Sequence, residues 1–189
     1  MKYTLVIVES PAKCGKIESI LGSGYKCIAS YGHLQELRNL KDIDIQNNFT
    51  PKFSHIEKKQ QQIDKLRKCI SSADDVILAT DDDREGEGIA WHICELFNLP
   101  VETTKRIVFH EITEGAIKAA VKNPTRLNMN MVNAQQARQI LDIFPAGSEE
   151  PLRLDFFGDE LEHIRLFDPI SQRSTGRIKS AQLSPCLLY

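Results

Sequence analysis

Apolar residues in the first two-thirds of the chain form two alternating kinds of pattern. Short, β-branched runs are typical of strands that are buried on both faces. Such runs occupy residues 3–8 and 75–80, and two further strand candidates cover residues 25–31 and 106–109. Between them, apolar residues recur every three or four positions, as they do along one side of a helix. These helical patterns cover residues 11–22, 56–70, 86–98, 113–122 and 131–141.

Strands that alternate with helices predict an α/β fold, in which crossovers build a mainly parallel, Rossmann-like sheet flanked by helices. Residues 35–56 are polar and weakly patterned, which favours a loop with a short strand around Phe53. From about Ile143 the pattern changes to an antiparallel β type. Two alternating runs around Gly158-Asp159 predict a β-hairpin, and residues 172–183 can supply a third strand.

Composition is that of an ordinary globular protein. The chain has 189 residues, of which 41% are hydrophobic and 26% charged, and its net charge is -2. These values exclude wholesale disorder, and no apolar run approaches the roughly 18 residues of a spanning helix. Near-neutral charge argues against nucleic-acid binding through a bulk positive field. The chain starts with a strand pattern rather than a secretory signal, and its five scattered cysteines include no C-x-x-C pair, which indicates reduced thiols.

The densest chemistry lies where the third strand pattern gives way to a helix. Residues 81–87 contain five carboxylates, which repel one another unless water or a cation neutralises them. In an extended segment the side chains alternate, which predicts that Asp81, Asp83 and Glu85 project to one side. Converging carboxylate oxygens suit Mg²⁺, which keeps several waters and is completed by phosphate oxygens.

A further acid, Glu9, ends the first strand pattern and is followed by a helix start with Lys13 and Lys16. A helix start with lysines attracts phosphate. Ligands of open α/β sheets bind beyond the carboxyl ends of the strands, so Glu9 and the acidic run together predict a metal-assisted phosphoryl-transfer site. Taken separately, each feature is better explained as solvated acid at the surface, and only their joint placement at strand ends favours the site.

Five motifs stand in a specific order: VESPAK at residues 8–13, YGHL at 31–34, ATDDDREGEGIAWH at 79–92, FHEIT at 109–113 and NAQQAR at 133–138. Together they closely resemble the N-terminal region of type IA DNA topoisomerases over residues 1–142. That region contains the toprim fold, which these enzymes share with primases and some nucleases. The resemblance implies passage of DNA through a transient, enzyme-bridged break in one strand.

The resemblance also implies roles for individual residues. Glu9 is expected beside the scissile phosphate, in acid/base chemistry and at the metal, and Lys13 stabilises the phosphate charge. Asp81, Asp83 and Glu85 match the family's Mg²⁺ ligands.

Among the neighbouring side chains, Glu87 is expected to support the metal site from outside. Arg84 suits bidentate binding of a phosphate, or else neutralises its acidic neighbours. His33 is expected to shape the pocket for the DNA strand, with a purely structural histidine as the alternative. Gln135 and Arg138 lie on a helix that contacts single-stranded DNA in the family, and a packing role for Gln135 is equally compatible.

The chain departs from the family in its nucleophile. Enzymes of this class use a tyrosine that a later domain presents to the metal site, and no family tyrosine motif is found here. The tyrosines are Tyr3, Tyr25, Tyr31 and Tyr189, and none of them is assigned this role. The domains that form the strand-passage gate are also missing, and Gly88 replaces a residue that is often alanine, which weakens the helix slightly.

Beyond the seam at residues 140–142, the motifs at 140–147, 154–160 and 167–169 resemble a different family. Residues 140–184 are similar to a β-rich segment of bacterial transcription-repair coupling factor, which is also found in the excision-repair helicase. A natural fusion, a recombined sequence and a joining artefact are all compatible with this tail.

The sequence therefore predicts a toprim domain at 1–122, a helix at 123–142 that leads toward gate domains, and a β segment of different origin at 143–189. We expect the Mg²⁺-dependent part of a type IA topoisomerase that acts on single-stranded regions of DNA but is inactive alone. A stand-alone toprim nuclease or phosphotransferase, and a non-catalytic module that binds a DNA-repair partner through 143–189, are the alternatives. The expected location is cytoplasmic and nucleoid-associated, or viral or nuclear, and neither secreted nor in a membrane.

Overall fold

The computed structural model describes residues 3–38, 42–44, 50–141, 151–157, 160–167 and 174–180. The chain divides into two compact units, Met1–Gln135 and Gln136–Tyr189. The division falls inside helix α5 (Met129–Leu141), and each unit is described by itself. No helix among the described residues is long and apolar enough to cross a membrane.

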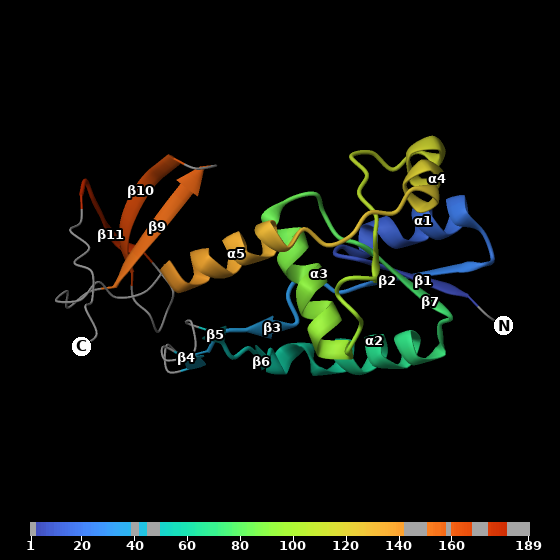
Figure 1. Ribbon diagram of the computed structural model, residues 1–189, viewed down its shortest axis with the longest axis horizontal. Coiled ribbons are helices and arrows are strands. Elements are labelled where there is room, and N and C mark those ends of the chain that lie inside the picture. Colours follow the sequence, from blue (N-terminus) through green and yellow to red (C-terminus); the bar gives the residue numbers. More distant parts are fainter. Residues whose placement is uncertain are drawn as a thin grey trace. The chain divides into compact units, whose positions relative to one another are not determined.

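The first unit is built on a four-stranded parallel sheet with strand order β2-β1-β7-β8 (Figure 1). Strand β1 (Thr4–Val8) pairs with β2 (Tyr25–Ala29) on one side and with β7 (Asp75–Ala79) on the other. The short β8 (Lys105–Arg106) pairs with the far side of β7. This sheet confirms the predicted α/β fold.

Helices cover both faces of the sheet because strand side chains alternate between them. Leu5 and Ile7 of β1 pack in a core with residues of α2 (Gln60–Ser72) and α3 (Arg84–Phe97). Val6 and Val8 point the other way, toward Ile17 of α1 (Cys14–Leu21) and Ile117 of α4 (Glu114–Lys122). In Figure 1, α1 and α4 accordingly lie across the sheet from α2.

The segment between β2 and α2 is more ordered than the sequence predicts. Instead of one short strand around Phe53, it contains two antiparallel ladders. One joins β3 (Gln35–Glu36) to β6 (Ser54–His55), and the other joins β4 (Ile43–Asp44) to β5 (Thr50–Pro51). Phe53 packs edge-on against the ring of His92, with 4.5 Å between centroids, which attaches this segment to α3.

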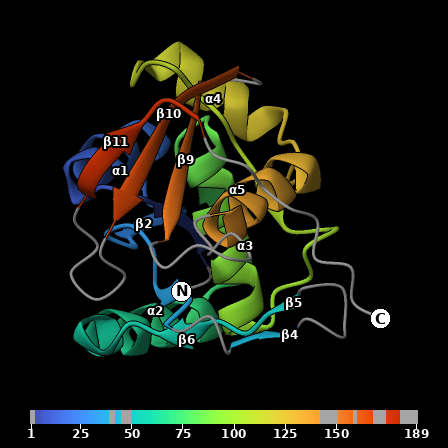
Figure 2. The same ribbon diagram turned by 90° about the vertical axis from the view of Figure 1, so that its left-hand side faces the viewer.

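The second unit contains three antiparallel strands in the order β11-β10-β9 (Figure 2). They are β9 (Leu152–Phe157), β10 (Glu160–Phe167) and β11 (Ser174–Ile178). Phe157 lies opposite Glu160, which confirms the predicted hairpin, although Gly158-Asp159 lie outside the described residues. The third predicted strand is also confirmed, because β11 pairs with β10.

Candidate metal and phosphate site at the strand ends

The carboxyl ends of three strands meet at one edge of the parallel sheet. Val8 lies level with Ala29 on one side and Ala79 on the other. The ladder continues past the strands, since the backbone N–H of Tyr31 donates to the carbonyl oxygen of Glu9 over 2.9 Å. Glu9 therefore lies just beyond the end of β1, between the segment after β2 and the acidic segment after β7. This is the edge at which the sequence predicts a binding site, because ligands of open α/β sheets bind beyond the carboxyl ends of the strands.

The acidic segment folds differently from the extended form that the sequence pattern suggests. Helix α3 begins at Arg84, two residues earlier than predicted, and Asp83 is its N-cap. The Asp83 carboxylate accepts a hydrogen bond of 2.6 Å from the backbone N–H of Gly86. Glu85 therefore lies in the first turn of the helix, and the expected alternation of Asp81, Asp83 and Glu85 along a strand is wrong.

Gly86 is required by close packing at this turn. A Cβ atom on it would lie 2.1 Å from the carbonyl oxygen of Asp81, far inside van der Waals contact. The hydroxyl of Thr80 also donates to the carbonyl of Gly86 over 2.7 Å. The first turn of α3 therefore packs directly against the segment that follows β7, and this contact fixes the position of the acids.

Glu9, Lys13, Asp81 and Asp83 form one electrostatic cluster. Partial burial raises the pKa of Glu9, and the negative charges of Asp81 and Asp83 raise it further, while Lys13 and His33 oppose this shift. The ammonium of Lys13, at the start of the first helical segment, forms an ion pair with Asp81. Acids from two strand ends and a lysine from a third element are thereby brought together.

The donor set of this cluster fits Mg²⁺. Its members are carboxylates that are partly open to water, with Asp81 48% exposed. Within the described part of the chain, no three His, Cys, Asp or Glu side chains form a ready-made metal cage. Mg²⁺ needs none, because it is bound through one or two carboxylates and completes its shell with water and phosphate.

A second group of polar side chains surrounds Glu85. Its carboxylate contacts His33 Nε2 at 2.5 Å and accepts a hydrogen bond of 3.4 Å from Gln135. Nδ1 of His33 lies 3.3 Å from Nδ1 of His92, so one of these two atoms carries a proton. Burial lowers the pKa of His92 to about 4, so His92 is neutral at pH 7. His33 therefore connects the acidic segment to a buried, uncharged ring.

Gln135 is nearly buried, at 5% exposure, and its side chain lies over Gly88. A Cβ atom at Gly88 would come within 3.0 Å of the Gln135 amide, which gives a packing reason for glycine at this position. The geometry favours the packing role that the sequence leaves open for Gln135.

Of the other predicted residues, Lys16 and Arg84 belong to the first unit and Arg138 to the second. Arg84 begins α3, and Lys16 is exposed on α1. No hydrogen bond or ion pair joins Lys16 to the acids within the residues described. Arg138 lies on α5, and its side chain is outside the described part, as is Tyr189.

Comparison with known proteins identifies the first unit. A sequence model of the Toprim domain matches residues 4–112, more than half of the chain. The chain belongs to the toprim domain family. It is also similar to full-length topoisomerase I from Thermotoga maritima, with 43% sequence identity and a TM-score of 0.67. That match covers 73% of this chain and 24% of the topoisomerase chain, so the present chain spans about a quarter of that protein.

The tail matches a different family. A sequence model of the UvrB interaction domain matches residues 127–189. Both resemblances drawn from the sequence are thus confirmed. The matched region begins before α5, so it includes the helix that the sequence assigns to the topoisomerase pattern.

A buried arginine of the toprim domain organises the acidic segment and is missed by the sequence analysis. Arg106 in β8 is 0% exposed. Its guanidinium donates to the carbonyl oxygens of Thr80 and Asp81, each over 2.8 Å, and to the carboxylate of Glu87 over 3.0 Å. A charged residue inside an otherwise apolar strand pattern was the available signal.

Glu87 completes this buried network. It is 3% exposed, and its second oxygen accepts a hydrogen bond of 3.0 Å from the backbone N–H of Asn128. Its carboxylate is therefore occupied by Arg106 and by the chain before α5. The described contacts connect Glu87 to the acidic segment through Arg106, which also binds the carbonyl oxygens of Thr80 and Asp81.

Replacing Arg106 tests this network. Arg106→Met leaves the Glu87 carboxylate buried without its partner, so we expect the free energy of unfolding to fall by about 3–5 kcal/mol in urea denaturation. Arg126→Met, which removes an exposed arginine bonded to the Thr103 carbonyl, is the control and should lose less than about 1 kcal/mol. The double variant Arg106→Met/Glu87→Met should recover part of the loss. A single variant as stable as the control would contradict the network.

The close approach at Gly86 gives a second prediction. Gly86→Ala forces the Asp81 backbone to move, and we expect it to lose about 1–3 kcal/mol of unfolding free energy. Gly115→Ala in α4 is the matched control, because nothing lies within 4 Å of its added Cβ and alanine favours the helix. Thermal unfolding of both variants measures the difference, and equal effects would show that the turn has more room than the structure describes.

Proposed function

We propose that the first unit is the Mg²⁺-binding part of a type IA DNA topoisomerase, an enzyme that cleaves one DNA strand, passes DNA through the break and religates it. The observation that carries the proposal is the clustering of Glu9, Lys13, Asp81 and Asp83 at the strand ends. The family match and the similarity to topoisomerase I support it.

In this proposal the ligands for Mg²⁺ are drawn from Glu9, Asp81, Asp83 and Glu85, and the bound ion neutralises phosphate charge. Lys13 lies beside Asp81 and supplies a positive charge to the same phosphate. Glu9 is the acid/base group of this proposal, which gives a proton to the leaving oxygen of the scissile phosphodiester on cleavage and takes it back on religation. Arg84 follows the N-cap of α3 and binds the neighbouring phosphate, where the helix start also favours an anion.

Contacts to single-stranded DNA are assigned in this proposal to Lys13, Lys16, His33 and Arg138. Gln135, the fifth residue predicted to contact DNA, is nearly buried and is assigned an indirect part. His33 and Gln135 both bind the Glu85 carboxylate, and they orient this acid although they lie far apart in the sequence. Lys16 is exposed in the first turn of α1, three residues after Lys13, which is the N-cap of that helix.

The attacking nucleophile comes, in this proposal, from outside the 189 residues. Tyr3 donates its hydroxyl to the carbonyl of Cys69 over 3.0 Å, which places it at the opposite end of β1 from Glu9. Tyr25 also lies at the far end of its strand. Tyr31 is close to Glu9 but lacks the family's nucleophile motif. The isolated chain should therefore bind metal without relaxing DNA.

The tail has a separate proposed role. Residues 143–189 bind a DNA-repair partner, and the match to the UvrB interaction domain supports this. Its described strands form an antiparallel sheet in which β11 is an edge strand, and edge strands offer unpaired backbone groups to another chain.

Metal binding is the direct test. Calorimetry with Mg²⁺ should show binding to the intact chain, and Asp81→Asn and Asp83→Asn should each weaken it at least tenfold by removing a carboxylate. Asparagine is also a good N-cap, so Asp83→Asn keeps the start of α3. Asp64→Asn, an exposed acid on α2, should leave binding unchanged. Absence of Mg²⁺ binding would contradict the proposal and favour a non-catalytic module.

Activity assays separate the topoisomerase part from a stand-alone nuclease, which uses the same acids with water as the nucleophile. The purified chain should neither relax nor nick supercoiled plasmid in Mg²⁺. Nicking that is abolished by Asp81→Asn would favour the nuclease, and relaxation by the chain alone would contradict the missing nucleophile.

A further inference from the structure

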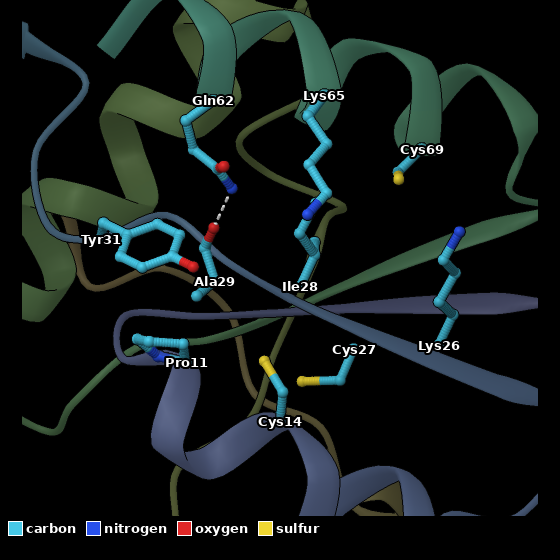
Figure 3. A pocket seen from close by; sticks show the side chains of 10 residues that line it. All are labelled: Pro11, Cys14, Lys26, Cys27, Ile28, Ala29, Tyr31, Gln62, Lys65 and Cys69. Carbon is cyan, nitrogen blue, oxygen red and sulfur yellow. Dashed lines mark hydrogen bonds between the residues drawn. The ribbon is translucent and has the colours of Figure 1, made fainter. Parts of the chain in front are cut away.

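A pocket of about 280 Å³ lies at the β2 edge of the sheet and is lined in part by Tyr31 (Figure 3), whose N–H donates to the carbonyl of Glu9. The first turn after β1, the edge strand β2 and helix α2 form its walls. Gln62 holds the α2 wall in place by donating to the carbonyl of Ala29. Strand β1 lies between β2 and β7, so this pocket at β2 and the acidic segment after β7 lie on opposite sides of Glu9.

The pocket is cationic in character. Lys26 and Lys65 line it without an acidic side chain in the described lining, although the Glu18 carboxylate accepts a hydrogen bond from the Cys27 N–H. The thiols of Cys14 and Cys27 face each other on its floor (Figure 3). Burial raises the pKa of both thiols, so they remain uncharged and present a small apolar surface. An anionic ligand with an apolar part matches this combination.

Tyr31 is part of the lining of the pocket. It is 51% exposed, one of the two exposed large hydrophobic residues in the described chain. Its backbone has φ 61°, a left-handed conformation that is uncommon for a tyrosine. Two contacts hold it there: its N–H donates to the Glu9 carbonyl, and Lys59 donates to the Tyr31 carbonyl. The Lys59 ammonium lies 5.9 Å from the ring centroid.

We propose that Tyr31 and this pocket bind an unpaired nucleotide of a DNA strand next to the phosphate at Glu9. The base stacks on the Tyr31 ring, and Lys65 neutralises the adjoining phosphate. This inference rests on the proposed function, because the DNA strand that it places on Tyr31 is the one bound at the phosphate site.

Three features favour a single strand over other ligands. A base can stack on an exposed aromatic ring only when its face is open, which a duplex does not offer. Lysines along the same surface track a phosphate backbone. The backbone hydrogen bond between Tyr31 and Glu9 keeps these two residues side by side, so that one strand can contact both.

Fluorescence anisotropy with a labelled oligodeoxythymidylate, in buffer without Mg²⁺, tests the stacking contact on the full chain. Tyr31→Ala should weaken binding about tenfold, because one stacked base contributes an effect of that order. Tyr31→Phe should bind like the original chain, since the ring is kept. Both substitutions leave a non-glycine residue at the same φ, so their comparison isolates the ring. Met129→Ala, at the other exposed large hydrophobic residue, is the matched control.

An abasic oligonucleotide of the same length provides an internal control. It should bind the original chain and Tyr31→Ala equally, because it has phosphates but no bases. Lys65→Gln should reduce the slope of log affinity against log salt concentration by about one, because one phosphate contact is lost. Lys122→Gln on α4 should leave this slope unchanged.

Photocrosslinking covers the case in which Tyr31→Ala fails to fold. An oligonucleotide containing 5-iodouracil should crosslink to Tyr31 of the original chain, as identified by mass spectrometry of the peptides. Crosslinks only elsewhere, unchanged affinity of a folded Tyr31→Ala chain, or no single-strand binding by the original chain would each overturn the inference. Loss of Mg²⁺ binding with an intact Tyr31 effect would instead overturn the metal site alone.

Discussion

Parallel pairing of β1 with both neighbours is the constraint on which the rest of the toprim unit depends. Residues 5–8 are completely buried, so this strand cannot be shifted without exposing apolar side chains on both faces. Its register brings Val8, Ala29 and Ala79 level, and each strand then releases its next residues at the same edge. Glu9, Tyr31 and Asp81 are close in space for this reason, although they are far apart in sequence.

Gathering acids at one edge creates repulsion, and the protein balances it with cations in different environments. Arg106 is buried and holds the backbone beneath Asp81, while its charge is matched by Glu87. Lys13 is partly exposed and pairs with Asp81 directly. The buried pair fixes geometry, whereas the exposed pair can exchange for another cation at small cost. This division leaves the acids in place and still accessible.

Local patterns predicted the strands and helices of the first unit because each has its own periodicity. The strand-end rule also predicted that Glu9 and Asp81 would meet. The start of α3 was missed because the carboxylates suggested an extended metal loop, whereas Asp83 and the Gly86 amide have N-cap spacing. The roles of Arg106 and the Tyr31 pocket depend on contacts between distant segments, which no local pattern contains.

The central claim is that the strand-end acids bind a divalent ion as one site. Mn²⁺, a paramagnetic substitute for Mg²⁺, broadens the NMR signals of nearby amides, so a titration with trace Mn²⁺ locates the bound ion. The account predicts selective broadening at Glu9 and at residues 81–85, reversed by excess Mg²⁺ and absent in Asp81→Asn. Broadening confined to other acids, or none at all, would contradict it.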